Sequence, residues 1–328
     1  MNEEAEQEQR EWEAEVAENL QQLYEQSDCG CDGVKILTID GTAVSQKRGK
    51  VLLSGYDYIR HQTTLYDFES HRIQMGPLTR VKRNRNAAVT LRNGNVMVFG
   101  GHNEDGFLTS CELLDVKKMT FSEVGHMLKA RHFLSAVLLK SGLVFIVGGY
   151  DMSCELYDPA DNSFRASKAK TSTDRFGHSA SLLPNGKVLV CGGDGNFYEM
   201  QTTEIYDPET DSFSDGPMMN VKRCYHTATT LADGRVLVCA GDVNKDDDMR
   251  LSTEIYDPES NSFSLGPELN TGRHYHFASL LPDGRVWVGG GCTTDSRITT
   301  EFFNPDTNSF TPAIYMWDGY QEAIASPY

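Results

Sequence analysis

A strongly apolar segment that ends in or near glycine recurs six times along this chain of 328 residues, and this repetition constrains the fold more than any other feature. The copies read VLLSGY, VMVFGG, FIVGG, VLVCGG, VLVCAG and VWVGGG, and their last residues are Tyr56, Gly101, Gly149, Gly193, Gly241 and Gly291. These positions lie 45, 48, 44, 48 and 50 residues apart. A period of about 47 residues is long enough for four short strands and their turns.

Each copy has the same order of strands and turns. The fourth reads HSASLL, the turn Pro184-Asn185-Gly186, KVLVCGG, a variable loop, TEIYD, a second turn and SFS. Asn-Gly and Asp-Gly dipeptides between the first two strands supply the positive φ angles of tight hairpins. The second strand is apolar at nearly every position, which is typical of a strand buried on both faces. Sheets of this kind must pack against one another, so we predict a β-propeller with one blade per repeat.

Three features of the repeat resemble the kelch family: the Gly doublet, the Glu-hydrophobic-Tyr-Asp-Pro block and the closing Ser-Phe. The resemblance covers about residues 42–311. It implies an all-β, six-bladed kelch-type β-propeller. The first copy departs from the pattern, with Ser54-Gly55-Tyr56 in place of the doublet and no Glu before Leu65. We place the propeller at residues 34–311 and expect either Val34–Asp40 or the tail 312–328 to supply a closing strand.

The first 33 residues differ from the rest of the chain. Residues 1–28 hold nine Glu and one Asp against one Arg, so they carry -9 of the net charge of -17. Apolar residues recur there at spacings of three and four, at Trp12, Val16, Leu20, Leu23 and Tyr24. This periodicity predicts a short acidic amphipathic helix, followed by a linker at residues 29–33. Its apolar face is expected to dock on the propeller, on a second copy as an oligomerisation element, or on a partner as a second contact.

Charge and cysteine usage limit the partners and the compartment. A chain with 30 Lys and Arg against 47 Asp and Glu repels phosphate backbones and anionic lipid, so we expect neither nucleic acid nor a membrane as partner. No basic segment followed by an apolar one opens the chain, as a signal peptide would. Eight cysteines without dense spacing are typical of reduced thiols, and we expect a cytoplasmic protein.

Two sets of polar residues recur at fixed positions of the repeat. An Arg stands eight residues before the Leu that ends the first strand, and a Glu accompanies the third strand: Arg83, Arg131, Arg175, Arg223 and Arg273 with Glu112, Glu155, Glu204, Glu254 and Glu301. Repetition from blade to blade favours structural ion pairs over a reaction site, which needs different residues to converge. For the same reason we interpret His178, His226 and His276 as framework residues and expect no metal site.

Function on a repetitive scaffold is expected where the repeats differ. The kelch resemblance implies that the segment around each Arg and the loop after the Gly doublet line the mouth of the central channel. The positions two after each Arg are Arg85, Phe133, Gly177, Tyr225 and Tyr275, and beside them lie Asn84, His132, Phe176, Cys224 and His274. Arg, Tyr and His are suited to interaction hot spots because they combine contact area with a polar group. Simple packing of loops around the mouth is the alternative.

One loop after the doublet is long and acidic. Its segment from Asp242 to Asp248 resembles the start of an EF-hand loop, but Asp247 stands where Gly is needed and Thr253 where Glu is needed. We therefore expect no calcium site there. We predict that partner binding involves Arg85, Phe133, Tyr225, His274, Tyr275 and Asp242.

These observations favour a protein-interaction scaffold that binds a peptide or partner protein at the mouth of the ring, without catalytic residues or a cofactor. The roughly 33 residues before the ring are too few for the BTB or F-box domains of kelch adaptors. The alternative is a sugar enzyme or binder of the kelch epimerase type acting in the channel, where Arg85, His274 and Asp242 offer acid, base and anion-binding groups. Galactose oxidase, also similar in its repeats, takes copper ligands from a further domain, whereas 17 residues follow Thr311 here.

Overall fold

The computed structural model describes residues 44–45, 50–54, 62–67, 72–195, 198–242, 250–281, 283–293 and 299–315. The helix expected within residues 1–33 and the closing strand expected at residues 34–40 lie outside the described residues. So do residues 316–328 of the tail, whereas its first residues continue a strand to Tyr315. Within the described residues no helix is long and apolar enough to cross a membrane.

The described strands form six antiparallel sheets of four strands each. The first holds β1 (Val44–Ser45), β2 (Lys50–Ser54), β3 (Gln62–Asp67) and β4 (Arg72–Leu78). The second holds β5 (Ala87–Thr90), β6 (Val96–Phe99), β9 (Ser110–Asp115) and β10 (Thr120–His126). The third holds β11 (Leu134–Leu138), β12 (Val144–Gly148), β13 (Ser153–Asp158) and β14 (Ser163–Lys170).

The remaining three sheets have the same order. The fourth holds β15 (Ser179–Leu182), β16 (Val188–Cys191), β19 (Thr203–Asp207) and β20 (Ser212–Asp215). The fifth holds β21 (Thr227–Thr230), β22 (Val236–Cys239), β23 (Thr253–Asp257) and β24 (Ser262–Leu265). The sixth holds β26 (Phe277–Leu280), β27 (Val286–Gly289), β29 (Thr299–Asn304) and β30 (Ser309–Tyr315).

Three two-stranded sheets lie between these elements. Two are hairpins within the loop after a Gly doublet: β7 (His102–Asn103) with β8 (Gly106–Phe107), and β17 (Asp194–Gly195) with β18 (Tyr198–Glu199). The third pairs β25 (Arg273–His274) with β28 (Cys292–Thr293). The repeat pattern did not predict these small sheets, because they form in the segments that differ between repeats.

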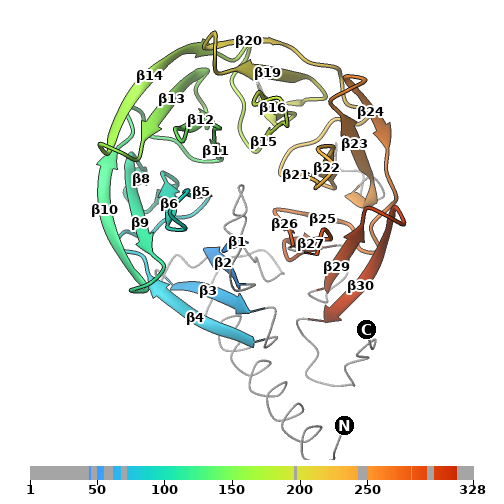
Figure 1. The fold of residues 1–328 in the computed structure, drawn as a ribbon, viewed down its shortest axis with the longest axis horizontal. Coiled ribbons are helices and arrows are strands. Elements are labelled where there is room, and N and C mark those ends of the chain that lie inside the picture. Colours follow the sequence, from blue (N-terminus) through green and yellow to red (C-terminus); the bar gives the residue numbers. More distant parts are fainter. Residues whose placement is uncertain are drawn as a thin grey trace, which may run out of the picture.

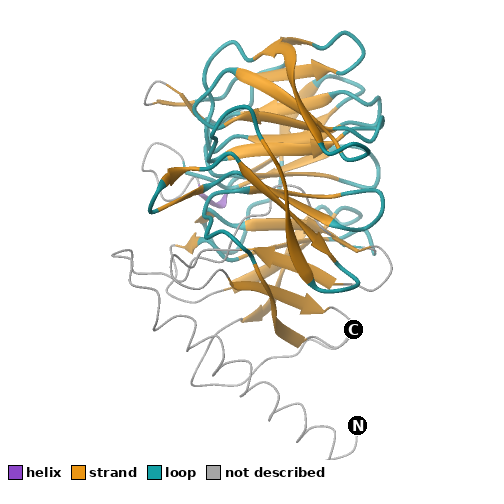
Figure 2. Cartoon of the chain, turned by 90° about the vertical axis from the view of Figure 1, so that its left-hand side faces the viewer, coloured by secondary structure: helices purple, strands orange, loops and turns teal. Residues whose placement is uncertain are grey.

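The five sheets from β5 to β30 are consecutive blades of a β-propeller (Figure 1). The first strand of each repeat is the innermost one, and β5, β11, β15, β21 and β26 contact one another in succession around the axis. The second strands β6, β12, β16, β22 and β27 are buried at every residue, as predicted from their apolar sequences. In side view the strands cross the ring, and loops cover both of its faces (Figure 2).

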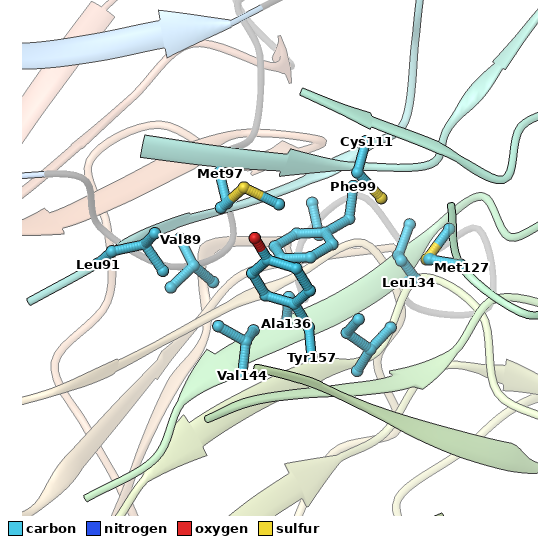
Figure 3. Packing of buried hydrophobic residues seen from close by; sticks show 12 residues of the cluster. Val89, Leu91, Met97, Phe99, Cys111, Met127, Leu134, Ala136, Val144 and Tyr157 are labelled. Carbon is cyan, nitrogen blue, oxygen red and sulfur yellow. The ribbon is translucent and has the colours of Figure 1, made fainter. Parts of the chain in front are cut away.

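The blades are held together by apolar side chains from adjacent sheets. Figure 3 shows Met97 and Phe99 of β6 facing Leu134 and Ala136 of β11, all within one buried cluster. The ring of Phe99 meets that of Tyr157 edge-on, with centroids 5.9 Å apart. Each blade therefore buries one side against the next, as predicted from the apolar second strands.

The predicted hairpin turns and glycine positions are confirmed. Gly94 has φ of 84°, and its amide donates to Leu91 O at 2.9 Å to close the turn between β5 and β6. At the end of β12, Gly148 has φ of 71°. A Cβ on Gly148 would lie 2.2 Å from Cε1 of His178 in the neighbouring blade and 2.6 Å from Arg175 O. The absence of a side chain at this position thus lets two blades approach.

The aligned histidines belong to the framework, as predicted. Nε2 of His226 lies 2.8 Å from Ser179 Oγ in the preceding blade, and Nε2 of His276 lies 2.9 Å from Thr227 Oγ1 in the same way. Burial is the main cause that lowers the pKa of His178 to about 3, and neighbouring Arg175 adds to it. Burial also holds the pKa of His226 and His276 well below the usual value. These histidines are therefore neutral in the folded protein at neutral pH.

Gly148→Ala should lower the free energy of unfolding by about 1–3 kcal/mol more than Gly94→Ala, because it adds an overlap between blades to the backbone strain. Gly94 is the matched control, since its φ is also positive but a Cβ there meets nothing within 4 Å. Urea unfolding of both variants measures the difference. Equal losses would mean that the close approach at Gly148 does not matter.

Acidification should destabilise the ring from about pH 6.5 downwards, because the unfolded chain binds protons on these histidines and the folded chain does not. At pH 5 each fully buried histidine should contribute a loss of roughly 2 kcal/mol. Urea midpoints between pH 7.5 and 5 measure the slope, which His226→Asn should reduce. A stability that does not change over this range would contradict the prediction.

Candidate functional site: the aromatic mouth of the propeller

Five buried ion pairs underlie one face of the ring, as the repeated Arg and Glu predicted. Each joins the Arg before the first strand to the Glu of the third strand in the same blade. The shortest N to O distances are 2.7 Å for Arg83–Glu112, 3.0 Å for Arg131–Glu155, 2.9 Å for Arg175–Glu204, 3.0 Å for Arg223–Glu254 and 3.0 Å for Arg273–Glu301.

Each pair also anchors main chain. Nη1 of Arg83 donates to Gly100 O at 2.7 Å and to Ser110 O at 3.0 Å, which ties the Gly doublet to the start of β9. The carboxylate of Glu112 accepts from the amides of Arg80 and Val81, at 2.6 and 3.1 Å. These amides belong to the connection from the preceding sheet. The pair therefore fixes the chain just before it reaches the axis of the ring.

The residue two after each Arg takes a left-handed backbone conformation. The φ angles are 56° for Arg85, 54° for Phe133, 62° for Gly177, 54° for Tyr225 and 55° for Tyr275. Four of these five are not glycine, and such angles are uncommon for residues with a Cβ.

A continuous chain of main-chain hydrogen bonds joins these five residues from blade to blade. The amide of Phe133 donates to Arg85 O at 2.9 Å, that of Gly177 to Phe133 O at 3.2 Å, that of Tyr225 to Gly177 O at 2.7 Å and that of Tyr275 to Tyr225 O at 3.1 Å. These bonds stabilise the strained conformation and place five equivalent positions around the axis. We call this end of the ring the mouth.

The large side chains at these positions pack together; we call Arg85, Phe133, Tyr225 and Tyr275 the axial cluster. The guanidinium carbon of Arg85 lies 4.3 Å above the centre of the Phe133 ring. The Tyr225 ring lies 4.2 Å from that of Tyr275 and 4.9 Å from that of Phe133. Burial, followed by the neighbouring Tyr275, raises the pKa of Tyr225, so its hydroxyl stays protonated. These four residues were predicted from the sequence as partner-binding residues, and the structure places them in contact with one another.

A second group of rings lies beside the axial cluster on the same face; we call Phe107, His132, Tyr150 and Phe176 the aromatic column. The distances between ring centres are 3.9 Å for Phe107–His132, 4.7 Å for His132–Tyr150 and 4.1 Å for Tyr150–Phe176, all in stacked geometry. The column joins three blades. His132 is buried, whereas Phe107 and Tyr150 are 55% and 47% exposed. Burial, followed by the neighbouring His102 and Arg85, lowers the pKa of His132 to about 4, so the column contains a neutral imidazole.

The other two predicted residues lie apart from the axial cluster or at its edge. His274 contacts Tyr275, with ring centres 4.9 Å apart. Asp242 accepts from Nη2 of Arg250 at 3.1 Å, and its backbone pairs with Cys224. The prediction missed Phe107 and Tyr150. Tyr150 directly follows the Gly doublet at the end of β12, and this position could have indicated that its ring lies at the mouth.

Comparison with known proteins supports the fold and nothing finer. No family model matches the chain, and no curated protein matches it. Among solved structures, a fungal alcohol oxidase of the AA5 family in complex with copper is similar, with a TM-score of 0.58 and 17% sequence identity. The match covers 79% of this chain and 71% of that one. At this identity the likeness shows a shared propeller architecture.

The described residues do not fit a copper centre. Copper in proteins is held by several nitrogen, oxygen or sulfur ligands that converge on one point. Within the described part of the chain, no group of three or more His, Cys, Asp or Glu converges in this way. The neighbouring imidazoles of His102 and His132 lie 5.5 Å apart and edge-on, and the His132 ring stacks against Phe107 and Tyr150. We therefore derive no copper chemistry for this mouth.

Arg223→Met should lower the free energy of unfolding by about 3–5 kcal/mol, because it leaves the Glu254 carboxylate buried without its cation. The control is Lys118→Met, which removes an exposed partner of Asp115 and should change stability little. Guanidinium unfolding measures both. Similar small losses in the two variants would show that the buried pairs do not support the ring.

Proposed function

We propose that this protein is a scaffold that binds a peptide or partner protein at the mouth of the propeller. The observation that carries the proposal is an aromatic surface assembled from several blades, with large rings exposed at Phe107 and Tyr150. Aromatic and Arg side chains held on a rigid frame are the residues that dominate protein interfaces. Here the main-chain hydrogen bonds around the axis provide that frame, so little ordering is needed on binding.

The geometry of the axial cluster favours an extended partner over a small molecule deep in the channel. Phe133, Tyr225 and Tyr275 contact one another across the axis, with ring centres 4.2–5.9 Å apart. These rings therefore form one packed group at this end of the axis. A partner is therefore expected to lie across the axial cluster and the aromatic column. His274 and Asp242 would contact the partner at the margin of this surface.

We further propose that the sheet β1–β4 is the sixth blade of a kelch-type ring. Its β4 packs beside β10, the outer strand of the next blade. Thr63 Oγ1 donates to Pro77 O at 2.7 Å, 14 residues later. The same bond, at the same spacing, joins Thr203 to Pro217 at 2.7 Å and Thr253 to Pro267 at 2.6 Å. The first repeat thus shares a detail of its outer hairpin with later blades, although its sequence is degenerate.

The other parts of the proposal come from the sequence. The acidic segment 1–33 would act as a second contact or an oligomerisation element, and the charge of -17 makes nucleic acid and membranes poor partners. A cytoplasmic location is proposed from the cysteine usage. The alternative function is a sugar enzyme or binder acting in the channel. Its support is the alcohol oxidase named above, which shares the fold.

Affinity capture with three forms of the full chain tests the binding proposal. The native protein should retain a specific partner, and the triple variant Arg85→Ala, Phe107→Ala, Tyr150→Ala should lose it, because hot-spot truncations cost about 2 kcal/mol or more each. Leu265→Ala is the control, since it truncates a side chain that is 69% exposed on the outer strand β24. A partner retained equally by all three forms would contradict binding at the mouth. A chain starting at Asp32 tests the acidic segment in the same assay.

A further inference from the structure

Three carboxylates gather beside one end of the aromatic column. The backbone of Asp194 pairs with that of Phe176, with N to O distances of 3.0 and 2.8 Å, and the Phe176 ring stacks on Tyr150. Glu199 lies opposite Asp194 in the β17–β18 hairpin. Asp174 precedes Phe176 by two residues, and its carbonyl oxygen lies close to Gly195. We call Asp174, Asp194, Glu199, Tyr150 and Phe176 the acidic-aromatic patch.

The carboxylates of this patch are not neutralised by described residues. Other acids at the mouth have basic partners, since Asp151 lies 2.5 Å from Lys129 Nζ and Asp242 lies 3.1 Å from Arg250 Nη2. Among the described residues, no Lys or Arg forms an ion pair with Asp174, Asp194 or Glu199. Oδ1 of Asp194 is shielded from solvent and has no hydrogen-bond partner in the described part of the chain. A carboxylate oxygen in this state lacks a donor.

The electrostatics of the patch agree with its geometry. Burial is the first cause that raises the pKa of Asp194, and the like charges of Glu199 and Asp174 raise it further. Burial and the negative charge of Asp194 also raise the pKa of the Tyr150 hydroxyl. A cation placed among these groups would relieve the repulsion between the carboxylates.

We propose that the acidic-aromatic patch binds an arginine side chain of a basic peptide. This inference rests on the proposed function and names the class of partner. The guanidinium offers several N–H donors in a planar fork that matches carboxylate oxygens two at a time. The aliphatic part of the side chain packs on exposed Tyr150, as long basic side chains do on apolar surfaces. An arginine therefore satisfies both the unpaired carboxylates and the exposed ring.

Arginine fits this patch better than the other charged side chains. An acidic peptide would add like charge to three carboxylates on a chain with a net charge of -17. A lysine ammonium is a compact, strongly hydrated charge that cannot make the bidentate contact. We therefore expect the preference to run from arginine to lysine, with no binding of acidic peptides.

Fluorescence anisotropy with labelled Gly-Arg repeat peptides tests the inference on the full chain. The arginine peptide should bind more tightly than a matched lysine peptide, and a glutamate peptide should not bind. Asp194→Asn should weaken binding of the arginine peptide about tenfold, through loss of a hydrogen bond between charged groups. Tyr150→Ala should weaken it about threefold by removing apolar contact area, whereas Tyr150→Phe should have a smaller effect.

Two controls are needed. One shows that weaker binding is not caused by unfolding, and the other shows that it is not caused by a change in the net charge of the protein. Asp194→Asn should not lower the urea midpoint, because it removes a charge held among like charges. Glu259→Gln makes the same change of charge at the other face, where Glu259 lines a groove of about 430 Å³ with Pro184 and Asp233. If Asp194→Asn and Glu259→Gln weaken binding of the arginine peptide equally, the peptide is attracted by the net negative charge and not by the patch. This result would overturn the inference.

The remaining outcomes separate this inference from the proposed function. No binding of the arginine peptide, or a preference for the glutamate peptide, would overturn it. A captured partner that depends on Arg85, Phe107 and Tyr150 but not on Asp194 would also overturn it, while the binding function would stand. If neither a partner nor the arginine peptide binds at the mouth, both proposals fail.

Discussion

The buried pair between an Arg at the start of a blade and a Glu on its third strand is the interaction on which the rest of this structure depends. Each pair is buried, where a charge without its partner is costly, so the two groups and the main-chain groups that they bind must keep one geometry. That geometry holds the Gly doublet against the third strand. It also fixes the position of the residues that follow the Arg and lie near the axis. Because the pair recurs in five blades, five loops reach the mouth at equivalent positions.

In a repetitive frame of this kind, the residues that stabilise the fold and the residues that are available for function occupy different positions of the repeat. Positions that the frame uses are the same in each blade, whereas the residue two after each Arg varies from Arg85 through Phe133 and Gly177 to Tyr225 and Tyr275. The main-chain bonds between these residues need no particular side chain, so the side chains are free to differ. The variation has produced an aromatic surface with three carboxylates at one side that form no ion pair within the described part of the chain. This surface, and not the fold shared with an alcohol oxidase, is the basis for assigning a function to the protein.

Much of the framework follows from sequence because it is local or repeated. The Asn93-Gly94 turn and the buried second strands were predicted from residue type, and the Arg–Glu pairs and the framework histidines from their repeated spacing. The kelch resemblance implied that the members of the axial cluster lie at the mouth, because they occupy one position of the repeat, but it did not predict that their side chains pack together. Phe107, Tyr150 and the three carboxylates of the acidic-aromatic patch were not predicted as binding residues. Phe107 and Glu199 lie in loops that differ in length between repeats, and Tyr150, Asp174 and Asp194 lie at repeat positions where the residue type changes from blade to blade. Phe176 and Tyr150 are 26 residues apart in the sequence and belong to adjacent blades. Their stacking could not be predicted from the period of the repeat.

The sequence by itself determined the repeat, the strand order within a blade and the groups that stay buried in pairs. These follow from hydrophobic alternation, from turns that need positive φ and from the cost of burying a lone charge. Only the tertiary structure decided that Arg85, Phe133, Tyr225 and Tyr275 pack together at the axis. It also decided that Asp174, Asp194 and Glu199 lie close enough to repel one another, with no ion pair to a Lys or Arg among the described residues. The reason is that side chains from different blades meet only when the sheets close around a common axis, and their separation there depends on the packing between blades.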